Sequence, residues 1–338
     1  MRLRTTPLGP IALDPTSGRW IAVRSAVEAG AADLGVPAEI DLLGVLALPA
    51  AERSALAEQV ARAAAESESV DPATAGLPFP ARSMRAFMVF PGHLEQSARV
   101  LVKRFFPPPM ARAVATYERV THRTFPALKP NKGFYAAPPM YVGNHAAMLG
   151  DHEDVWWPSY TEFLDFELEL ACVLARPLSD ATPEQARAAI GGWFVLNDWS
   201  ARDVQAEDVR HSVFGPVVKS KTFANSMGAD VVTADELPDW RTATGRVLVD
   251  GEQWCAGNTA EAHWDIGDML AHASKGEYLA PGDVFSTGTM PGCCGLELDR
   301  WVRRGQTVRL EIDGIGDLTT TISADATPET ALGSRTDA

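Results

Sequence analysis

The distribution of apolar and polar residues divides the chain into a small N-terminal unit and a larger, strand-rich remainder. Residues 49–67 have the three-to-four-residue apolar spacing of an amphipathic helix, and the Ser-, Pro-, Gly- and Asp-rich stretch 67–81 predicts a linker. We therefore expect a small N-terminal domain over residues 1–75, a second domain over residues 80–325, and a flexible C-terminal tail over residues 326–338.

The second domain is expected to begin with an apolar segment and two helices. Residues 83–93, SMRAFMVFPGH, predict an extended segment that ends at His93. The spacing of apolar residues in 94–106 and 107–120 predicts two helices separated by a proline stop. From residue 134 onward, short apolar runs alternate with turn residues.

A helix followed by a strand is the clearest local signal in the second domain. In ATPEQARAAIGGWFVLND, Thr182 can cap a helix, Pro183 suits its first turn, and Gln185 occupies the capping-box position. The pair Gly191–Gly192 is expected to end the helix before the strand WFVLND.

Two further patterns predict strands near the C-terminus. Residues 278–289, YLAPGDVFSTGT, combine a Pro-Gly-Asp turn with a following strand, and residues 305–323 show two alternating runs around Asp-Gly, which is typical of a hairpin. No Rossmann pattern is present, so the chain as a whole predicts an α+β, β-rich fold.

Two neighbouring glutamates raise a question about desolvation. In DFELELACVL, Glu167 and Glu169 point to the same face of a predicted strand, while the leucines around them point into the core. Such carboxylates either lie on a solvated sheet face or bind a hard cation, and the apolar flanks favour the cation. Asp198, at the end of the strand in FVLNDWSARDVQ, would supply a third carboxylate for Mg²⁺, Mn²⁺ or Ca²⁺.

The charge of the chain narrows the range of partners. With 30 basic and 44 acidic residues, the formal net charge is −14, which argues against nucleic acid and anionic membranes but leaves a small anionic substrate open. The four cysteines form no CxxC pair, so neither a zinc site nor a disulfide framework is expected. The start, MRLRTTPLGP, lacks the apolar region of a signal peptide, and no stretch reaches membrane-spanning length. We therefore expect a cytoplasmic protein.

The order and spacing of four motifs resemble the fumarylacetoacetate hydrolase family over roughly residues 80–325. These motifs are DFELELACVL, NDWSARDVQ, a Lys-Thr-Phe segment and STGT. The resemblance implies a mixed β-roll or β-sandwich catalytic domain with a small N-terminal domain, assembled as a homodimer. It also implies metal-dependent cleavage of a carbon–carbon bond in a β-diketo acid.

The resemblance also assigns roles to individual residues. Glu167, Glu169 and Asp198 match the metal ligands, with Mg²⁺ as the first choice of metal. The residues that match groups holding the substrate or stabilising its charge are Arg202, Gln205, Lys221, Tyr141 and Thr289. The alternative for Arg202 is an ion pair with Asp203, and the alternative for Tyr141 and Thr289 is packing. Either Lys219 or Lys221 could be the active-site lysine, and the Lys-Thr-Phe order favours Lys221.

A histidine and a glutamate complete the set that the resemblance implies. His93 matches the histidine that activates water, and Glu297 in GLELDRW matches its partner. A carboxylate orients an imidazole and stabilises its protonated form, which suits a general base. The alternative is a purely structural role for His93.

The chain departs from the family pattern near this histidine. Ala86 stands where longer members carry an additional aspartate ligand, and Pro91-Gly92 replace the more common residues before His93. These changes bear on hydrolysis more than on metal binding. They slightly favour a metal-dependent 2-oxo acid decarboxylase, tautomerase or hydratase as the alternative to a hydrolase. A third alternative is a catalytically silent protein that binds a diketo acid.

Overall fold

The computed structural model describes residues 1–30, 36–215 and 217–328. Within them, the main sheet is mixed and contains eleven strands. In spatial order they are β3 (Trp20–Ala22), β2 (Gly9–Leu13), β1 (Arg2–Thr6), β13 (Val231–Thr233), β10 (Ile190–Asn197), β9 (Glu167–Leu174), β16 (Asp283–Cys294), β4 (Ser83–Phe87) and β5 (Met140–Gly143), with β12 (Asn225–Met227) beside β10 and β6 (Met148–Leu149) beside β12.

A second sheet packs against one face of the main sheet. Its strands are β15 (Glu252–Asn258), β14 (Thr244–Val249), β17 (Thr307–Ile312), β18 (Gly316–Ser323) and β7 (Val155–Trp156), and the pair β8 (Leu164–Asp165) and β11 (Ser200–Ala201) lies apart. The larger apolar core fills the space between the sheets, where Leu168 and Leu170 of β9 meet Val247, Leu310 and Leu318. The fold is thus sheet-rich and mixed α/β.

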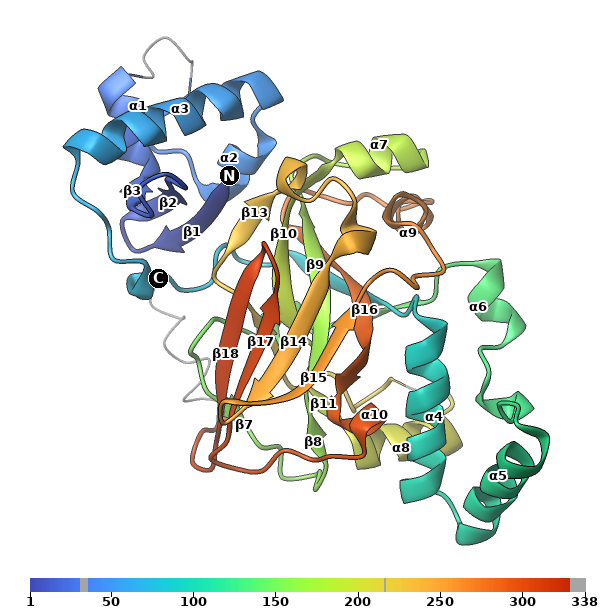
Figure 1. The fold of residues 1–338 in the computed structure, drawn as a ribbon. Helices are drawn as coiled ribbons and strands as arrows, with labels where there is room; N and C mark the ends of the chain where they lie inside the picture. The colour runs from blue at the N-terminus through green and yellow to red at the C-terminus, as the bar shows by residue number, and fades with distance from the viewer. Residues whose placement is uncertain (31–35, 216, 329–338) are drawn as a thin grey trace.

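The helices lie around the edges and outer face of the sheets (Figure 1). They are α1 (Val23–Gly30), α2 (Leu42–Ala47), α3 (Ala50–Glu66), α4 (Pro91–Phe105), α5 (Pro108–Thr121), α6 (Lys132–Ala136), α7 (Pro183–Ala188), α8 (Arg202–His211), α9 (Ile266–Ala273) and α10 (Gly295–Leu298). Residues of α1, α2 and α3 build a second apolar cluster with Ala171, Val173 and Phe194, which point away from the first core. Glu167 and Glu169 share the face of Ala171, because alternate strand residues point the same way.

Several expectations about local structure are confirmed. Helix α3 falls within residues 49–67, and β17 pairs with β18 as the predicted hairpin. Thr182 caps α7, and Gln185 completes the capping box. The expected helix end at Gly191–Gly192 is wrong, because α7 ends at Ala188 and both glycines lie inside β10. A Cβ at Gly191 would lie 2.6 Å from that of Ala175, so close packing explains the glycine there.

The segment before α4 also differs from the expectation. The strand ends at Phe87, and α4 begins at Pro91, so His93 lies in the first helical turn rather than at the end of an extended segment. A proline suits this turn because its missing N–H has no partner there in any case.

The expected domain boundaries stay a prediction. Strand β1 pairs with β13, so the N-terminal strands extend the main sheet. Residues 329–338 of the expected tail lie outside the described residues. Among the helices of the described ranges, none is both long and apolar enough to cross a membrane.

Candidate active site

Three carboxylates converge where β9 and β10 pair. Glu167 and Glu169 are the first and third residues of β9, and Asp198 follows the last residue of β10. The backbone N–H of Asp198 bonds to the carbonyl of Glu167 at 3.3 Å, which holds the end of β10 against the start of β9. All three residues are at most 2% exposed. The sequence-predicted metal ligands therefore lie together in the fold.

The donor set fits a hard divalent cation. Each of the three residues offers an oxygen within 4.8 Å of the oxygens offered by the other two. One oxygen, Oδ1 of Asp198, is buried and makes no hydrogen bond within the described part of the chain. Carboxylate oxygens at this spacing are the ligands that Mg²⁺, Mn²⁺ and Ca²⁺ take, with water completing the coordination.

Two buried cations partly neutralise the carboxylates. The Lys221 ammonium donates to Glu167 and, at 2.6 Å, to Asp198. Arg202, the first residue of α8, donates to Asp165 and to Glu167, both at 2.7 Å. Its partner is thus not Asp203, which was the alternative. Lys219 is exposed, and its ammonium lies 5.1 Å from the centre of the Tyr160 ring, so Lys221 is the lysine in the site.

The surrounding charges push the pKa values of the two neighbouring glutamates in opposite directions. Burial alone would raise the pKa of Glu167, but Lys221 and Arg202 hold it well below its ordinary value. Burial, followed by the charges of Asp198 and Glu167, raises the pKa of Glu169 well above its ordinary value. Burial alone would lower the pKa of Lys221, whereas Asp198 and Glu167 raise it, so this side chain stays an ammonium. A divalent cation would relieve the repulsion that Glu169 experiences.

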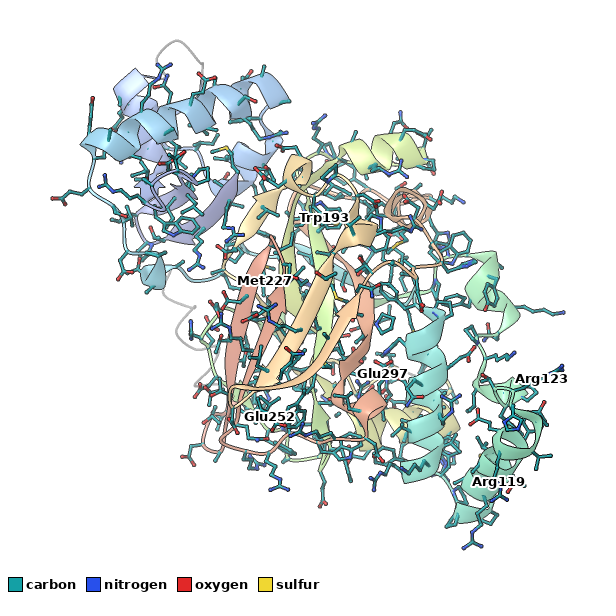
Figure 2. The ribbon with its side chains drawn as sticks, in the orientation of Figure 1. Arg119, Arg123, Trp193, Met227, Glu252 and Glu297 are labelled. Carbon is teal, nitrogen blue, oxygen red and sulfur yellow. The ribbon has the colours of Figure 1, made fainter. Side chains whose placement is uncertain are left out.

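A histidine–glutamate pair lies beside this cluster. Nδ1 of His93 lies 2.9 Å from Oε2 of Glu297, and both side chains are buried. Figure 2 shows Glu297 on α10 next to α4, the helix that carries His93. The Glu297 carboxylate also accepts from the backbone N–H of Gly292 at 3.1 Å and from the Cys294 thiol at 3.3 Å. This environment fixes the carboxylate and, through it, the imidazole.

The thiol of Cys294 supports the histidine–glutamate pair by donating a hydrogen bond to Glu297. Burial, followed by the negative charge of Glu297, raises the pKa of the Cys294 thiol well above its ordinary value. The thiol therefore keeps its proton, which suits a hydrogen bond to Glu297 and does not suit a nucleophile.

The remaining predicted residues lie in the same cavity, whose volume of about 230 Å³ is on the scale of a small metabolite. Tyr141 on β5 donates its hydroxyl proton to Asp198 at 2.5 Å, and Thr289 on β16 donates to Glu169 at 3.2 Å. The side-chain oxygen of Gln205 accepts from Arg202 at 2.9 Å, which leaves its amide nitrogen for other partners. The predicted residues that line the cavity are His93, Tyr141, Glu167, Glu169, Asp198, Arg202, Gln205, Lys221 and Thr289, with Glu297 behind His93.

Sequence reasoning missed two residues that support the site. The buried carboxylate of Asp165 holds Arg202 and also accepts from the backbone N–H groups of Gly295 and Leu296 at 2.7 and 2.9 Å. Asp165 continues the alternation of Glu167 and Glu169, and this pattern was a usable signal. The Ser286 hydroxyl donates to Glu169. Its signal was weaker, because only the pairing of β16 with β9 brings it there.

The departures from the family pattern also have places in the structure. Ala86 on β4 is paired with Tyr141 on β5 and with Ser286 on β16, and it packs in the same apolar cluster as Ala171. It therefore lies on the carboxylate face without contributing an oxygen. Pro91 and Gly92 form the first turn of α4, which carries His93 to its contact with Glu297. The changed residues are thus compatible with an assembled histidine–glutamate pair.

The proteins that resemble this chain have names that indicate several different activities. A Burkholderia multivorans protein with "hydrolase" in its name is 32% identical over 177 residues, which are 51% of this chain and 61% of that protein. The homoprotocatechuate catabolism bifunctional isomerase/decarboxylase of Escherichia coli is 27% identical over 249 residues, or 68% of this chain and 55% of that protein. The chain thus spans less than two thirds of the length of these curated relatives.

A structural superposition and a family match complete the comparisons. The fumarylpyruvate hydrolase of Pseudomonas aeruginosa, in complex with Mn²⁺ and pyruvate, superposes with a TM-score of 0.54 at 21% identity, covering 72% of this chain and 91% of that one. The family described as fumarylacetoacetate (FAA) hydrolase C-terminal matches residues 115–323, which is more than half of the chain. This protein belongs to the fumarylacetoacetate hydrolase family.

Proposed function

We propose that this protein is a metal-dependent hydrolase that cleaves a carbon–carbon bond in a β-diketo acid of the acylpyruvate type. The observation that carries the proposal is the contact between His93 and Glu297 beside the carboxylate cluster, because hydrolysis needs a base that can activate water. Support also comes from the Pseudomonas aeruginosa fumarylpyruvate hydrolase, whose structure contains Mn²⁺ and pyruvate.

In this proposal, Glu167, Glu169 and Asp198 hold the metal, with Mg²⁺ as the first choice and Mn²⁺ or Ca²⁺ as alternatives. When bound, the metal would act as a Lewis acid on the oxygens of the substrate. Tyr141 and Thr289 keep two of the ligands oriented through their hydroxyl groups, and both residues line the cavity that would hold the substrate.

The histidine performs the proton transfer that starts the reaction. Because Nδ1 of His93 bonds to Glu297, Nε2 is the nitrogen that accepts a proton from water. The water oxygen then forms a bond to the acyl carbonyl carbon. When the carbon–carbon bond breaks, its electron pair stays on the pyruvyl fragment as an enolate, which takes up a proton to give pyruvate. The other product is the carboxylic acid of the acyl group.

The cationic and amide groups stabilise the negative charge that develops. Lys221 lines the cavity, and its ammonium, which donates to Glu167 and Asp198, places a positive charge beside the carboxylate cluster. The free amide nitrogen of Gln205 can donate to a substrate oxygen, and Arg202 contributes its charge from a fixed position.

The alternative is a decarboxylase, tautomerase or hydratase of a 2-oxo acid. The similarity to the bifunctional isomerase/decarboxylase of Escherichia coli favours it. A decarboxylase or tautomerase would need the residues that stabilise an enolate but no water-activating base. A protein that binds a diketo acid without converting it is the other alternative.

A turnover panel separates these functions. The purified protein is offered acetylpyruvate, fumarylpyruvate, fumarylacetoacetate and oxaloacetate, each with Mg²⁺, with Mn²⁺ and with excess EDTA. Metal-dependent release of two fragments from a diketo acid supports the hydrolase, whereas CO₂ from oxaloacetate alone supports the alternative. Light scattering of the same sample tests the expected homodimer.

A further inference from the structure

The cavity has two chemically different walls. The carboxylates and Lys221 form one wall, on the main sheet and the segments that follow its strands. Leu94, Ala98 and Leu101 line the cavity from α4, and their spacing of four and three residues places them on one helix face. Val209 and Val217 continue this apolar wall from α8 and the segment after it.

One face of helix α8 lines the cavity from its charged end to its apolar end. Arg202, Gln205 and Val209 all line the cavity and are three and four residues apart, so they share one face of the helix. Arg202 is fully buried, whereas Val209 is 48% exposed. The cavity therefore runs along α8 from the charged end to an apolar mouth, over about 10 Å at the helical rise per residue.

The described lining residues offer no free cation to a second carboxylate of a substrate. Within the described part of the lining, the permanent cations are Arg202 and Lys221, and both are engaged by buried carboxylates. The basic side chains that follow Val209 on α8, Arg210 and His211, are paired with Glu207. An anionic tail along the apolar wall would lose its hydration without gaining a cationic partner.

We propose that the acyl group of the substrate is an uncharged, apolar chain that lies along Leu94, Ala98, Leu101 and Val209, so that the protein selects alkyl-type acylpyruvates over those that end in a carboxylate. This proposal rests on the proposed function for the identity of the substrate's polar end. The apolar wall accepts the tail through burial of surface, and a terminal charge is disfavoured because the described part of the lining has no free cation.

A pair of acids that cannot undergo the cleavage tests this selectivity separately from catalysis. 2-Oxooctanoate and 2-oxooctanedioate share a chain length and a 2-oxo acid end, and they differ in a terminal methyl group or carboxylate. Titration calorimetry of the whole chain with Mg²⁺ should give at least tenfold tighter binding of 2-oxooctanoate. Equal affinities, tighter binding of the dioate, or no detectable binding of either acid would overturn the proposal.

Two variants locate the selectivity on the wall. Val209→Lys places a cation at the mouth and, because the side chain is half exposed, should leave the fold intact; it should shift the affinity ratio at least tenfold toward the dioate. Val120→Lys makes the same change at an exposed position of α5 outside the cavity, and it should leave the ratio unchanged. An equal shift in both variants, or none in Val209→Lys, would contradict the assignment of the wall.

Turnover distinguishes failure of this proposal from failure of the proposed function. Along acetyl-, butanoyl- and hexanoylpyruvate, kcat/KM should rise about fourfold for each methylene, which is about 0.8 kcal/mol of apolar burial. If none of these compounds is cleaved, the hydrolase assignment fails, and the binding ratio of the two acids still decides the nature of the tail. If fumarylpyruvate is cleaved faster than hexanoylpyruvate, the hydrolase assignment stands and the apolar tail is wrong.

Discussion

Glu167 and Glu169 are two residues apart, yet their replacement by glutamine should change the stability of the metal-free protein in opposite directions. Glutamine has nearly the shape of glutamate; it removes the charge and replaces one accepting oxygen by a donating NH2 group. The Glu167 carboxylate accepts hydrogen bonds from Lys221 and Arg202, whereas Glu169 faces the negative charges of Asp198 and Glu167. Both residues are 2% exposed, so solvent screens neither of them appreciably.

The expected gain in stability on replacing Glu169 follows from the raised pKa of this residue. The folded protein holds this proton more tightly than the unfolded chain, so the stability from Glu169 is complete below its ordinary pKa of 4.5. That stability is lost as the pH rises toward the folded pKa. Two charged carboxylates within 4.8 Å repel each other by about 3 kcal/mol at an effective dielectric constant of about 20. Since Lys221 offsets part of this repulsion, Glu169→Gln should stabilise the metal-free protein by about 2 kcal/mol at pH 8. For 338 residues this raises Tm by about 3 °C.

Replacing Glu167 should instead lower the stability of the metal-free protein. Its lowered pKa means that it contributes stability above the ordinary value of 4.5, and this stability is lost as the pH falls through the folded pKa. Glu167→Gln leaves Lys221 and Arg202 buried with less negative charge around them. Breaking a buried pair in this way costs about 3 kcal/mol, so Tm at pH 8 should fall by about 4 °C.

Differential scanning calorimetry in excess EDTA, at pH 8 and pH 5, measures both shifts. The gain in Glu169→Gln should shrink at pH 5, because the pKa of the wild-type carboxyl is raised and the carboxyl takes up its proton as the pH falls. Titration with Mg²⁺ on the same variants should show at least tenfold weaker binding for each, because each loses a proposed ligand. A fall in Tm for both variants at pH 8, or an unchanged Mg²⁺ affinity in Glu169→Gln, would refute the reasoning.

Three further predictions address the proposed chemistry. His93→Ala should lower kcat for C–C cleavage at least 100-fold while Mg²⁺ affinity persists, and unchanged hydrolysis would exclude His93 as the base. Lys221→Met should lower kcat at least 100-fold in a steady-state assay and should also lower Tm. The matched change Lys219→Met at the exposed lysine should affect neither quantity. Equal losses in the two variants would show that the two lysines do not differ in role. Excess EDTA should abolish turnover and added Mg²⁺ should restore it, so full activity in EDTA would contradict the metal dependence.

The sequence by itself determined the elements and the residue types of the site. Alternation along DFELELACVL placed Glu167 and Glu169 on one face, because the side-chain period of a strand is two residues. Local chemistry also predicted α3, the cap of α7 at Thr182 and the hairpin of β17 and β18. These features depend on neighbouring residues, so a single chain contains the information.

Only the tertiary structure decided which groups share an environment. Lys221 and Lys219 have similar sequence surroundings, yet one is buried between carboxylates and the other is exposed. Burial raises the pKa of both glutamates, but at Glu167 it is outweighed by Arg202 of α8 and by Lys221 of the segment after α8. At Glu169 the charges of Asp198 and Glu167 add to the effect of burial. The apolar wall of α4 and α8 is likewise formed by packing of separate helices. Electrostatic and hydrophobic energies depend on distance in space, and sequence separation does not report that distance.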